Sequence, residues 1–188
     1  MIKDSLANGF RVAHDIGLAA WVGGSMFGKF ALNPAVSQVS SRAERGKVVN
    51  AAWSGYSLVN TTSLGAVTAG WFAARLTEAN PWRQTEAERQ LSKAKDVLVI
   101  AAVVTGTATA LQGARLTKQA PDGAVPIERG NEPAPETPRP AARIQRSLGV
   151  LGSLNIVSGL GLIGVNAVMA QRSYSRPPLR RGLLRRSR

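Results

Sequence analysis

The stretch SLGVLGSLNIVSGLGLIGVNAVMAQ, residues 147–171, contains no Asp, Glu, Lys or Arg over its 25 positions. Two further charge-free stretches occupy residues 48–74 and 97–114 and are 27 and 18 residues long. A helix needs about 20 consecutive apolar residues to cross the hydrocarbon core of a bilayer. A helix on the surface of a soluble protein carries charged residues on its outer face. These stretches therefore predict membrane-spanning helices.

A fourth, less regular apolar stretch lies near the N-terminus and covers residues 13–35. Lys29 interrupts it, and we expect its ammonium group to reach the lipid headgroups because it lies close to the end of the stretch. The fold class that follows is all-α, an integral membrane bundle of four transmembrane helices within residues 1–170. The predicted spans are residues 13–35, 49–74, 96–113 and 147–170.

Residues 114–146 form the longest connection between the predicted spans. Six of the ten prolines of the chain fall between Pro121 and Pro140, among Ala, Glu and Arg. Proline removes a backbone donor and ends helices. We therefore expect an extended, mobile linker that forms no packed core.

The charge of the chain lies in the connections and tails. The net charge is +13, from 24 Lys and Arg against 11 Asp and Glu. With four spans both termini share a side, and that side holds 14 basic residues against ten on the other. The positive-inside tendency therefore predicts a multi-pass protein of the cell membrane with both termini in the cytoplasm. Nucleic-acid binding is not expected, because interleaved aromatics and a folded reading element are missing.

The C-terminal tail, residues 171–188, carries seven arginines and no acid. Each basic residue close to an anionic leaflet contributes about 1 kcal/mol to membrane binding. The alternative is a solvated tail whose charge only sets topology. The arginines expected to contact anionic lipid are Arg180, Arg181, Arg185 and Arg186.

Small and weakly polar residues recur on one face of each predicted span when positions are plotted at 100° per residue. Membrane helices associate where small side chains let backbones approach and where hydroxyls and amides bond across the contact. We therefore predict that these faces point inward. The predicted helix-packing residues are Gly17, Gly24, Gly28, Ser57, Thr61, Gly65, Thr105, Thr109, Gly152, Asn155 and Gly159.

The amide side chains within the spans allow a second interpretation. They could line a polar cavity for a transported solute, or they could form hydrogen bonds between helices. Carboxylates typical of an ion path are missing from the spans, apart from edge residues such as Asp15 and Asp96. The lack of such carboxylates favours hydrogen bonds between helices over a polar cavity. The amides concerned are Asn60, Gln112, Asn155 and Asn166.

Residues that carry chemistry are few. The chain has no cysteine, which excludes disulfides, thiolate catalysis and Cys-ligated metals. His14 is the one histidine, so a metal centre is not expected. The sequence has no nucleophile motif and no phosphate- or dinucleotide-binding glycine loop. His14 is the candidate ligand for a cofactor, and the alternative is a histidine at headgroup level.

The segment His14-Asp-Ile-Gly-Leu-Ala-Ala-Trp21-Val-Gly-Gly24, with Phe27, Phe30 and Pro34 after it, resembles the first span of several small bacterial membrane families. One is a transmembrane-protein-205-like group of four-span proteins of unknown function, with which the span count agrees best. Similar openings occur in copper-resistance D-type domains and membrane-bound protoporphyrinogen oxidases. The resemblance to the haem-associated families implies a haem ligand at His14. Those proteins carry further histidines in later spans, and this chain has none.

Taken together, these features predict a non-enzymatic integral membrane protein without cofactor or metal. We expect an accessory or structural subunit of a larger membrane complex, with lipids and either a second membrane protein or another copy of the chain as partners. Two alternatives stay open. One is a transporter of small solutes, and the other is a haem-binding membrane oxidoreductase that uses His14.

Overall fold

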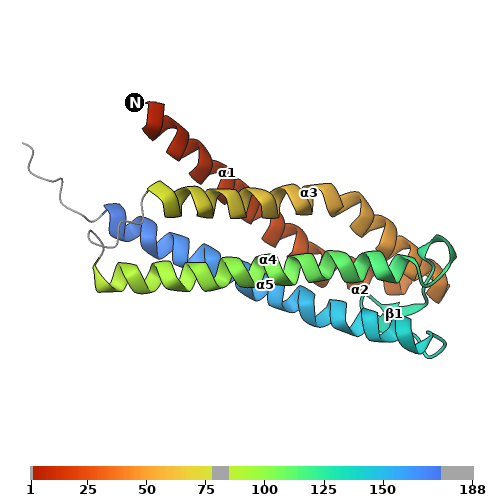
Figure 1. Cartoon of the computed structure of the whole chain (residues 1–188). Coiled ribbons are helices and arrows are strands. Elements are labelled where there is room, and N and C mark those ends of the chain that lie inside the picture. The colour runs from red at the N-terminus through yellow and green to blue at the C-terminus, as the bar shows by residue number, and fades with distance from the viewer. Residues whose placement is uncertain (1, 78–84, 175–188) are drawn as a thin grey trace, which may run out of the picture.

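Four long helices make up most of the chain in the computed structural model, which describes residues 2–77 and 85–174 (Figure 1). Of these described residues 86% are helical, which confirms the predicted all-α class. The long helices are α1 (Ile2–Phe27), α3 (Arg42–Thr77), α4 (Glu86–Thr117) and α5 (Arg139–Tyr174).

The chain stays helical beyond α1 through three short elements. They are the π-helix η1 (Gly28–Leu32), the α-helix α2 (Asn33–Ala35) and the 3₁₀ helix η2 (Val36–Gln38). The N–H of Asn33 donates to the Gly28 carbonyl, which is the wider π pattern. Pro34 has no N–H, so it cannot continue the regular ladder. The helical pitch therefore changes around the proline.

The long helices pair as α1 with α3 and as α4 with α5. α1 also crosses α5, and α3 contacts α4, so that the two pairs close into one bundle (Figure 1). Thr85 begins α4 with a capping box. Its hydroxyl accepts from the Glu88 N–H, and the Glu88 carboxylate accepts from the Thr85 N–H.

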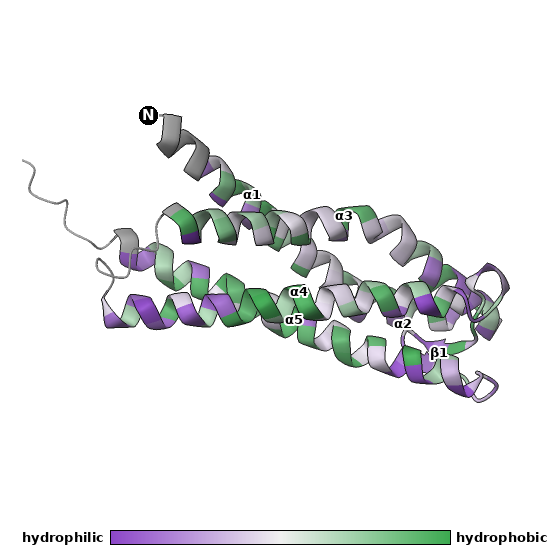
Figure 2. Ribbon diagram, in the orientation of Figure 1, coloured by the Kyte–Doolittle hydropathy of each residue, from purple (hydrophilic) through white to green (hydrophobic). Residues whose placement is uncertain are grey.

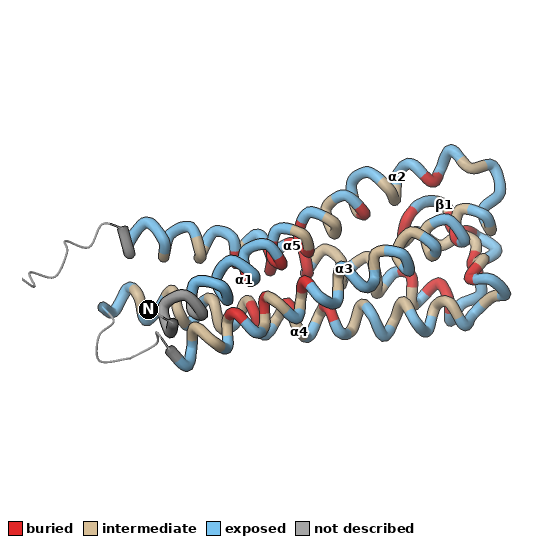
Figure 3. Tube along the Cα trace, turned by 90° about the horizontal axis from the view of Figure 1, so that it is seen from above, coloured by how far each residue is buried: buried red, intermediate tan, exposed pale blue. Residues whose placement is uncertain are grey.

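The core lies where α1 crosses the other helices. Buried positions follow the inner faces of the helices, while exposed positions cover most of the outer surface (Figure 3). The helices therefore meet along narrow contacts. The core residues are Leu18, Trp21 and Val22 of α1, Val67 of α3, Val99 and Ala102 of α4, and Leu162 of α5.

Two helical segments of the described residues are long and apolar enough to cross a membrane, Glu86–Thr117 and Arg139–Arg172. Apolar positions lie along their middle parts and hydrophilic positions near their ends (Figure 2). Arg11 and Asp15 lower the mean hydropathy of α1, and frequent hydroxyl residues lower that of α3. The count of four membrane spans therefore stays a prediction.

Residues 118–138, here called the cap, fold against the ends of the bundle. The cap contains the 3₁₀ turn η4 (Pro121–Gly123) and an antiparallel hairpin of β1 (Ile127–Arg129) and β2 (Glu132–Pro133). The expectation of an extended, mobile linker over residues 114–146 was wrong, because the first four of these belong to α4, the last eight belong to α5, and the rest is folded.

Buried apolar residues and positive-φ glycines explain why the cap is ordered. Val125 and Ile127 are each 3% exposed, so the cap has a small core of its own. Gly123 and Gly130 adopt φ of 67° and 52°, a region that favours glycine, and they allow the turns. The prolines restrict the unfolded chain, which lowers the entropy that the cap loses on ordering.

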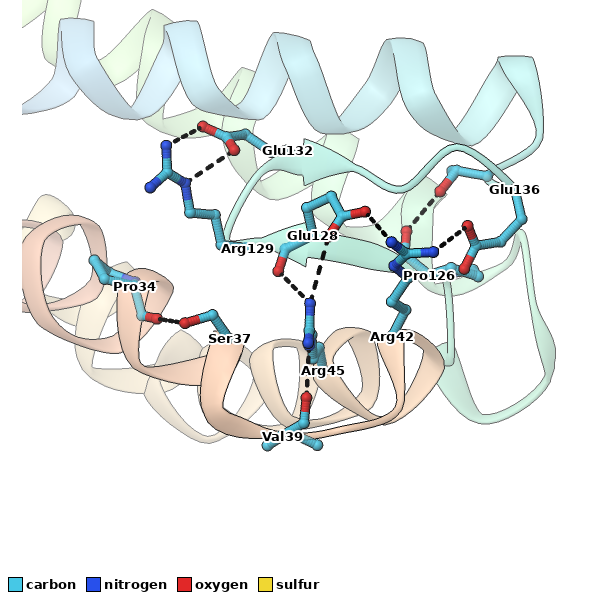
Figure 4. Close-up of polar contacts among 11 residues, drawn as sticks. Pro34, Ser37, Val39, Arg42, Arg45, Pro126, Glu128, Arg129, Glu132 and Glu136 are labelled. Atoms are coloured by element: carbon cyan, nitrogen blue, oxygen red, sulfur yellow. Dashed lines mark hydrogen bonds and ion pairs between the residues drawn. The ribbon is translucent and has the colours of Figure 1, made fainter.

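Two arginines of α3 hold the hairpin to the bundle (Figure 4). Arg45 donates from Nε to the Val39 carbonyl at 2.7 Å and from Nη1 to the Glu128 carbonyl at 2.9 Å. Arg42 lies 2.7 Å from the Glu128 carboxylate and 3.3 Å from that of Glu136. The Arg45 side chain is only 15% exposed, so water competes little for its bonds.

Replacing Arg45 by Gln is expected to loosen the cap. The change removes hydrogen bonds from a charged donor, each worth about 1.5–3 kcal/mol. Limited trypsinolysis should therefore cut after Arg129, in the hairpin, several-fold faster than in the unmodified chain. Lys47→Gln is the matched control, because exposed Lys47 lies 3.9 Å from exposed Asp122. Equal cleavage in Arg45→Gln and Lys47→Gln would show that Arg45 does not hold the cap.

Candidate functional site

His14 is buried between α1, α3 and α5. The residue is only 3% exposed. Gly70 of α3 makes the space for it, because a Cβ at Gly70 would lie 2.5 Å from the His14 Cβ. α1 therefore approaches α3 closely at the one histidine of the chain.

Both ring nitrogens of His14 have partners. Nδ1 lies 2.8 Å from the Val67 carbonyl oxygen, which can only accept, so Nδ1 carries the proton. Nε2 lies 3.2 Å from the amide nitrogen of Asn166, which donates to it. The same amide nitrogen lies 3.4 Å from a carboxylate oxygen of Asp15. The arrangement holds a neutral imidazole that links three helices.

These residues do not fit a haem or a metal ion. An imidazole ligates through a free nitrogen lone pair, and the Nε2 lone pair of His14 accepts the Asn166 amide. Among residues 2–77 and 85–174, no group of three or more His, Asp or Glu side chains could hold a metal ion. Acid–base or ligand chemistry at His14 would first require the loss of a buried hydrogen bond.

A second polar contact joins α3 to α4 close to the core. The Trp71 indole donates to the Asp96 carboxylate at 2.8 Å, and Arg75 Nε donates to the same oxygen at 3.0 Å. This contact was not predicted from the sequence. The available signal was the spacing of Trp71 and Arg75, since residues four apart share a helix face.

Thr105, Thr109 and Asn155 meet between α4 and α5. The Thr105 hydroxyl bonds to the Asn155 side-chain oxygen, and the Asn155 amide donates to the Thr109 hydroxyl at 3.3 Å. Gln112 donates to Ser147 at 3.2 Å across the same pair of helices. These predicted packing residues lie at a helix contact, where their polar atoms bond to each other.

Several predicted packing glycines lie where a neighbouring helix comes close. A Cβ at Gly17 would lie 2.8 Å from the Ser63 carbonyl oxygen. The aromatic rings of α3 occupy the space beside Gly24 and Gly28, and α1 side chains occupy that beside Gly159. The rings are those of Tyr56, which also donates to the Ala20 carbonyl at 2.7 Å, and Trp53.

The predicted packing face of α3 does not lie against a neighbouring helix. Ser57, Thr61 and Gly65 are exposed on the outer side of the helix, and a Cβ at Gly65 would meet no atom within 4 Å. The buried face of α3 carries Ser63 and Val67 instead. Gly152 of α5 likewise has open space beside it.

Two further predictions concern basic residues that were expected to reach lipid headgroups. The ammonium group of Lys29, which was expected to reach the lipid headgroups, donates to the Ser153 hydroxyl of α5. The tail arginines expected to contact anionic lipid lie outside the described residues. They are Arg180, Arg181, Arg185 and Arg186.

Comparisons of the chain with protein-family models, with curated proteins and with solved structures give no match. The resemblance of the first span to the transmembrane-protein-205-like group therefore stays a prediction. Its residues His14 and Trp21 are both buried, at 3% and 1% exposure. In this structure they serve the contact between α1 and its neighbours.

Replacing Asn166 by Ala is expected to destabilise the bundle. The change leaves Nε2 of buried His14 without a donor, which costs about 1–3 kcal/mol. Thermal unfolding of the purified protein in detergent measures the loss. In a His14→Phe background the same Asn166→Ala change should cost little, because no imidazole nitrogen is left unpaired. An equal cost in both backgrounds would contradict the contact.

Proposed function

We propose that the chain is an integral membrane protein in which all four long helices span the bilayer. The observation that carries this proposal is the presence of large exposed apolar side chains on every long helix. Soluble monomers rarely expose continuous apolar patches beyond a few hundred Å², whereas lipid tails solvate such surfaces. Outward-facing apolar residues include Ile16 and Phe27 of α1, Leu58 and Phe72 of α3, Ile100 and Val104 of α4, and Val157 and Ile163 of α5.

The buried polar contacts support the same proposal. His14 and Asn155 are buried within the otherwise apolar core and are bonded across helices, while many other large apolar side chains are exposed. Membrane helices gain little free energy by burying large apolar side chains, because lipid solvates these side chains equally well. They therefore associate through small residues and hydrogen bonds. The inner and outer surfaces of this bundle have the chemistry that such association requires.

The hydroxyl groups of α3 are compatible with a membrane span. Ser57, Thr62 and Thr68 donate to carbonyls within α3, to Ser54 at 2.7 Å, to Leu58 at 2.9 Å and to Leu64 at 2.8 Å. A polar group in lipid is costly only when its hydrogen bonds are left unmade. The modest hydropathy of α3 therefore does not prevent it from crossing the bilayer in this proposal.

In the proposed orientation the start of α1 and the end of α5 face the cytoplasm. Both lie at one end of the bundle, opposite the cap (Figure 1). The basic residues on that side outnumber those on the cap side by 14 to ten. The positive-inside tendency supports this assignment.

The outer face of α3 supports a role as an accessory or structural subunit. Thr61, Gly65 and Thr68 line an apolar groove of about 500 Å³ that Val103 of α4 completes. Small side chains at such a groove permit close approach of another helix. We propose that a helix of a partner membrane protein lies there, and that the buried polar groups serve helix contacts rather than catalysis.

Single cysteines test the four spans, since the chain has none of its own. Cysteine at Ile16, Leu58, Val104 or Val157 is expected to resist a polar maleimide in intact membranes, because each position faces the hydrocarbon core. Lys118→Cys, in the exposed start of the cap, is the control and should react fast. Quantitative labelling followed by mass spectrometry gives the rates.

The labelling pattern separates the possible outcomes. Fast labelling at all four positions would overturn membrane insertion. Protection at Val104 and Val157 with fast labelling at Ile16 and Leu58 would leave a two-span protein.

Replacing Gly65 by Leu tests the subunit role. Nothing lies within 4 Å of a Cβ at Gly65, so leucine leaves the bundle intact and blocks only an outside partner. We expect native electrophoresis from mild detergent to show a large assembly that shrinks in this variant. Gly164→Leu on α5, with equally open surroundings, is the control and should keep the assembly. A monomeric unmodified chain would refute the subunit role.

A further inference from the structure

A cavity of about 610 Å³ lies between the cap and the first turns of α5. Its size is within the range of small-molecule sites. Three arginines of α5 line it, Arg139, Arg143 and Arg146, together with Thr137 and Glu128. The cavity is therefore rich in hydrogen-bond donors that suit an anion.

The three arginines lie on one face of α5. Positions 139, 143 and 146 fall within about 60° on a helical wheel and extend over about 10 Å. The described residues provide no hydrogen bond or ion pair for their guanidinium groups. Other cap-end arginines are paired: Arg42 and Arg45 with Glu128, and Arg129 with Glu132.

The residues that line the cavity carry a net positive charge, from three arginines against one glutamate. Glu128 supplies the negative charge among the lining residues, and Arg42 and Arg45 already neutralise it. α5 has no acidic residue in its first turn, although the N-terminal end of a helix dipole favours negative charge there. Three cations at that end repel one another and the dipole. A bound anion would relieve the repulsion.

We propose that this cavity binds a phosphate-bearing anion, which the three arginines hold. The planar guanidinium group matches phosphate oxygens in paired hydrogen bonds. The site directly precedes Ser147, where the charge-free stretch begins. In the proposed membrane orientation, on which the lipid source alone depends, the arginines therefore lie at headgroup depth. The ligand is the phosphate of an anionic lipid or a free phosphate.

Native mass spectrometry of the full-length chain in neutral detergent tests the site. The ligands are phosphatidylglycerol, zwitterionic phosphatidylcholine and inorganic phosphate. Arg143→Gln with Arg146→Gln is expected to weaken binding by at least about tenfold, since charged hydrogen bonds are lost. Both arginines are exposed, so the helix should persist, as circular dichroism would verify. Arg115→Gln with Lys118→Gln removes equal charge at the same bundle end, outside the cavity.

Two results would support the site and identify the source. Arginine-dependent preference for phosphatidylglycerol over phosphatidylcholine identifies a lipid headgroup. Arginine-dependent binding of inorganic phosphate without that preference identifies a free phosphate, and it would stand even if maleimide labelling refuted membrane insertion. Binding of neither ligand, or an equal loss in both double variants, would overturn the proposal.

Discussion

The close crossing of α1 over α3 and α5 is the contact on which the rest of the bundle depends. Gly17 and Gly70 remove the side chains that would separate α1 from α3, and Gly159 does the same where α5 meets Val22. Because no Cβ intervenes, dispersion contacts form between backbones. The same approach buries Trp21 in the core. A larger residue at these glycines would move α1 away from both neighbours.

The sequence predicted the helical class, and three of the predicted packing residues, Thr105, Thr109 and Asn155, meet between α4 and α5. It could not tell which face of α3 is buried. A stripe of hydroxyls has the same period whether it bonds to another helix or to its own carbonyls, as Ser57 and Thr68 do. Burial of Ser63 and Val67 follows from the position of α1, which no local pattern contains.

The cap was missed for a related reason. Its proline content indicates an extended chain when composition alone is considered. Order comes from contacts distant in sequence: Arg45 reaches Glu128 across 83 positions, and the cap backbone at Val125 fills the space beside Gly46. The apolar residue Ile127 was visible in the sequence, but its burial depends on α3 being in place. Non-local pairing of this kind leaves no periodic signal.

The polar groups near the core and those at the cap differ in charge and in how far they are paired. Near the core, His14 and Asn166 satisfy each other as neutral groups, so this junction is suited to fixing helix positions. At the cap, the carboxylate of Glu128 is committed to α3, and this leaves the cations at the start of α5 without an acid in the described chain. Neutral, self-satisfied polar groups stabilise a fold in lipid, whereas uncompensated charge beside a cavity attracts a ligand. The proposed anion site therefore lies at a different place along the bundle from the buried His14–Asn166 contact.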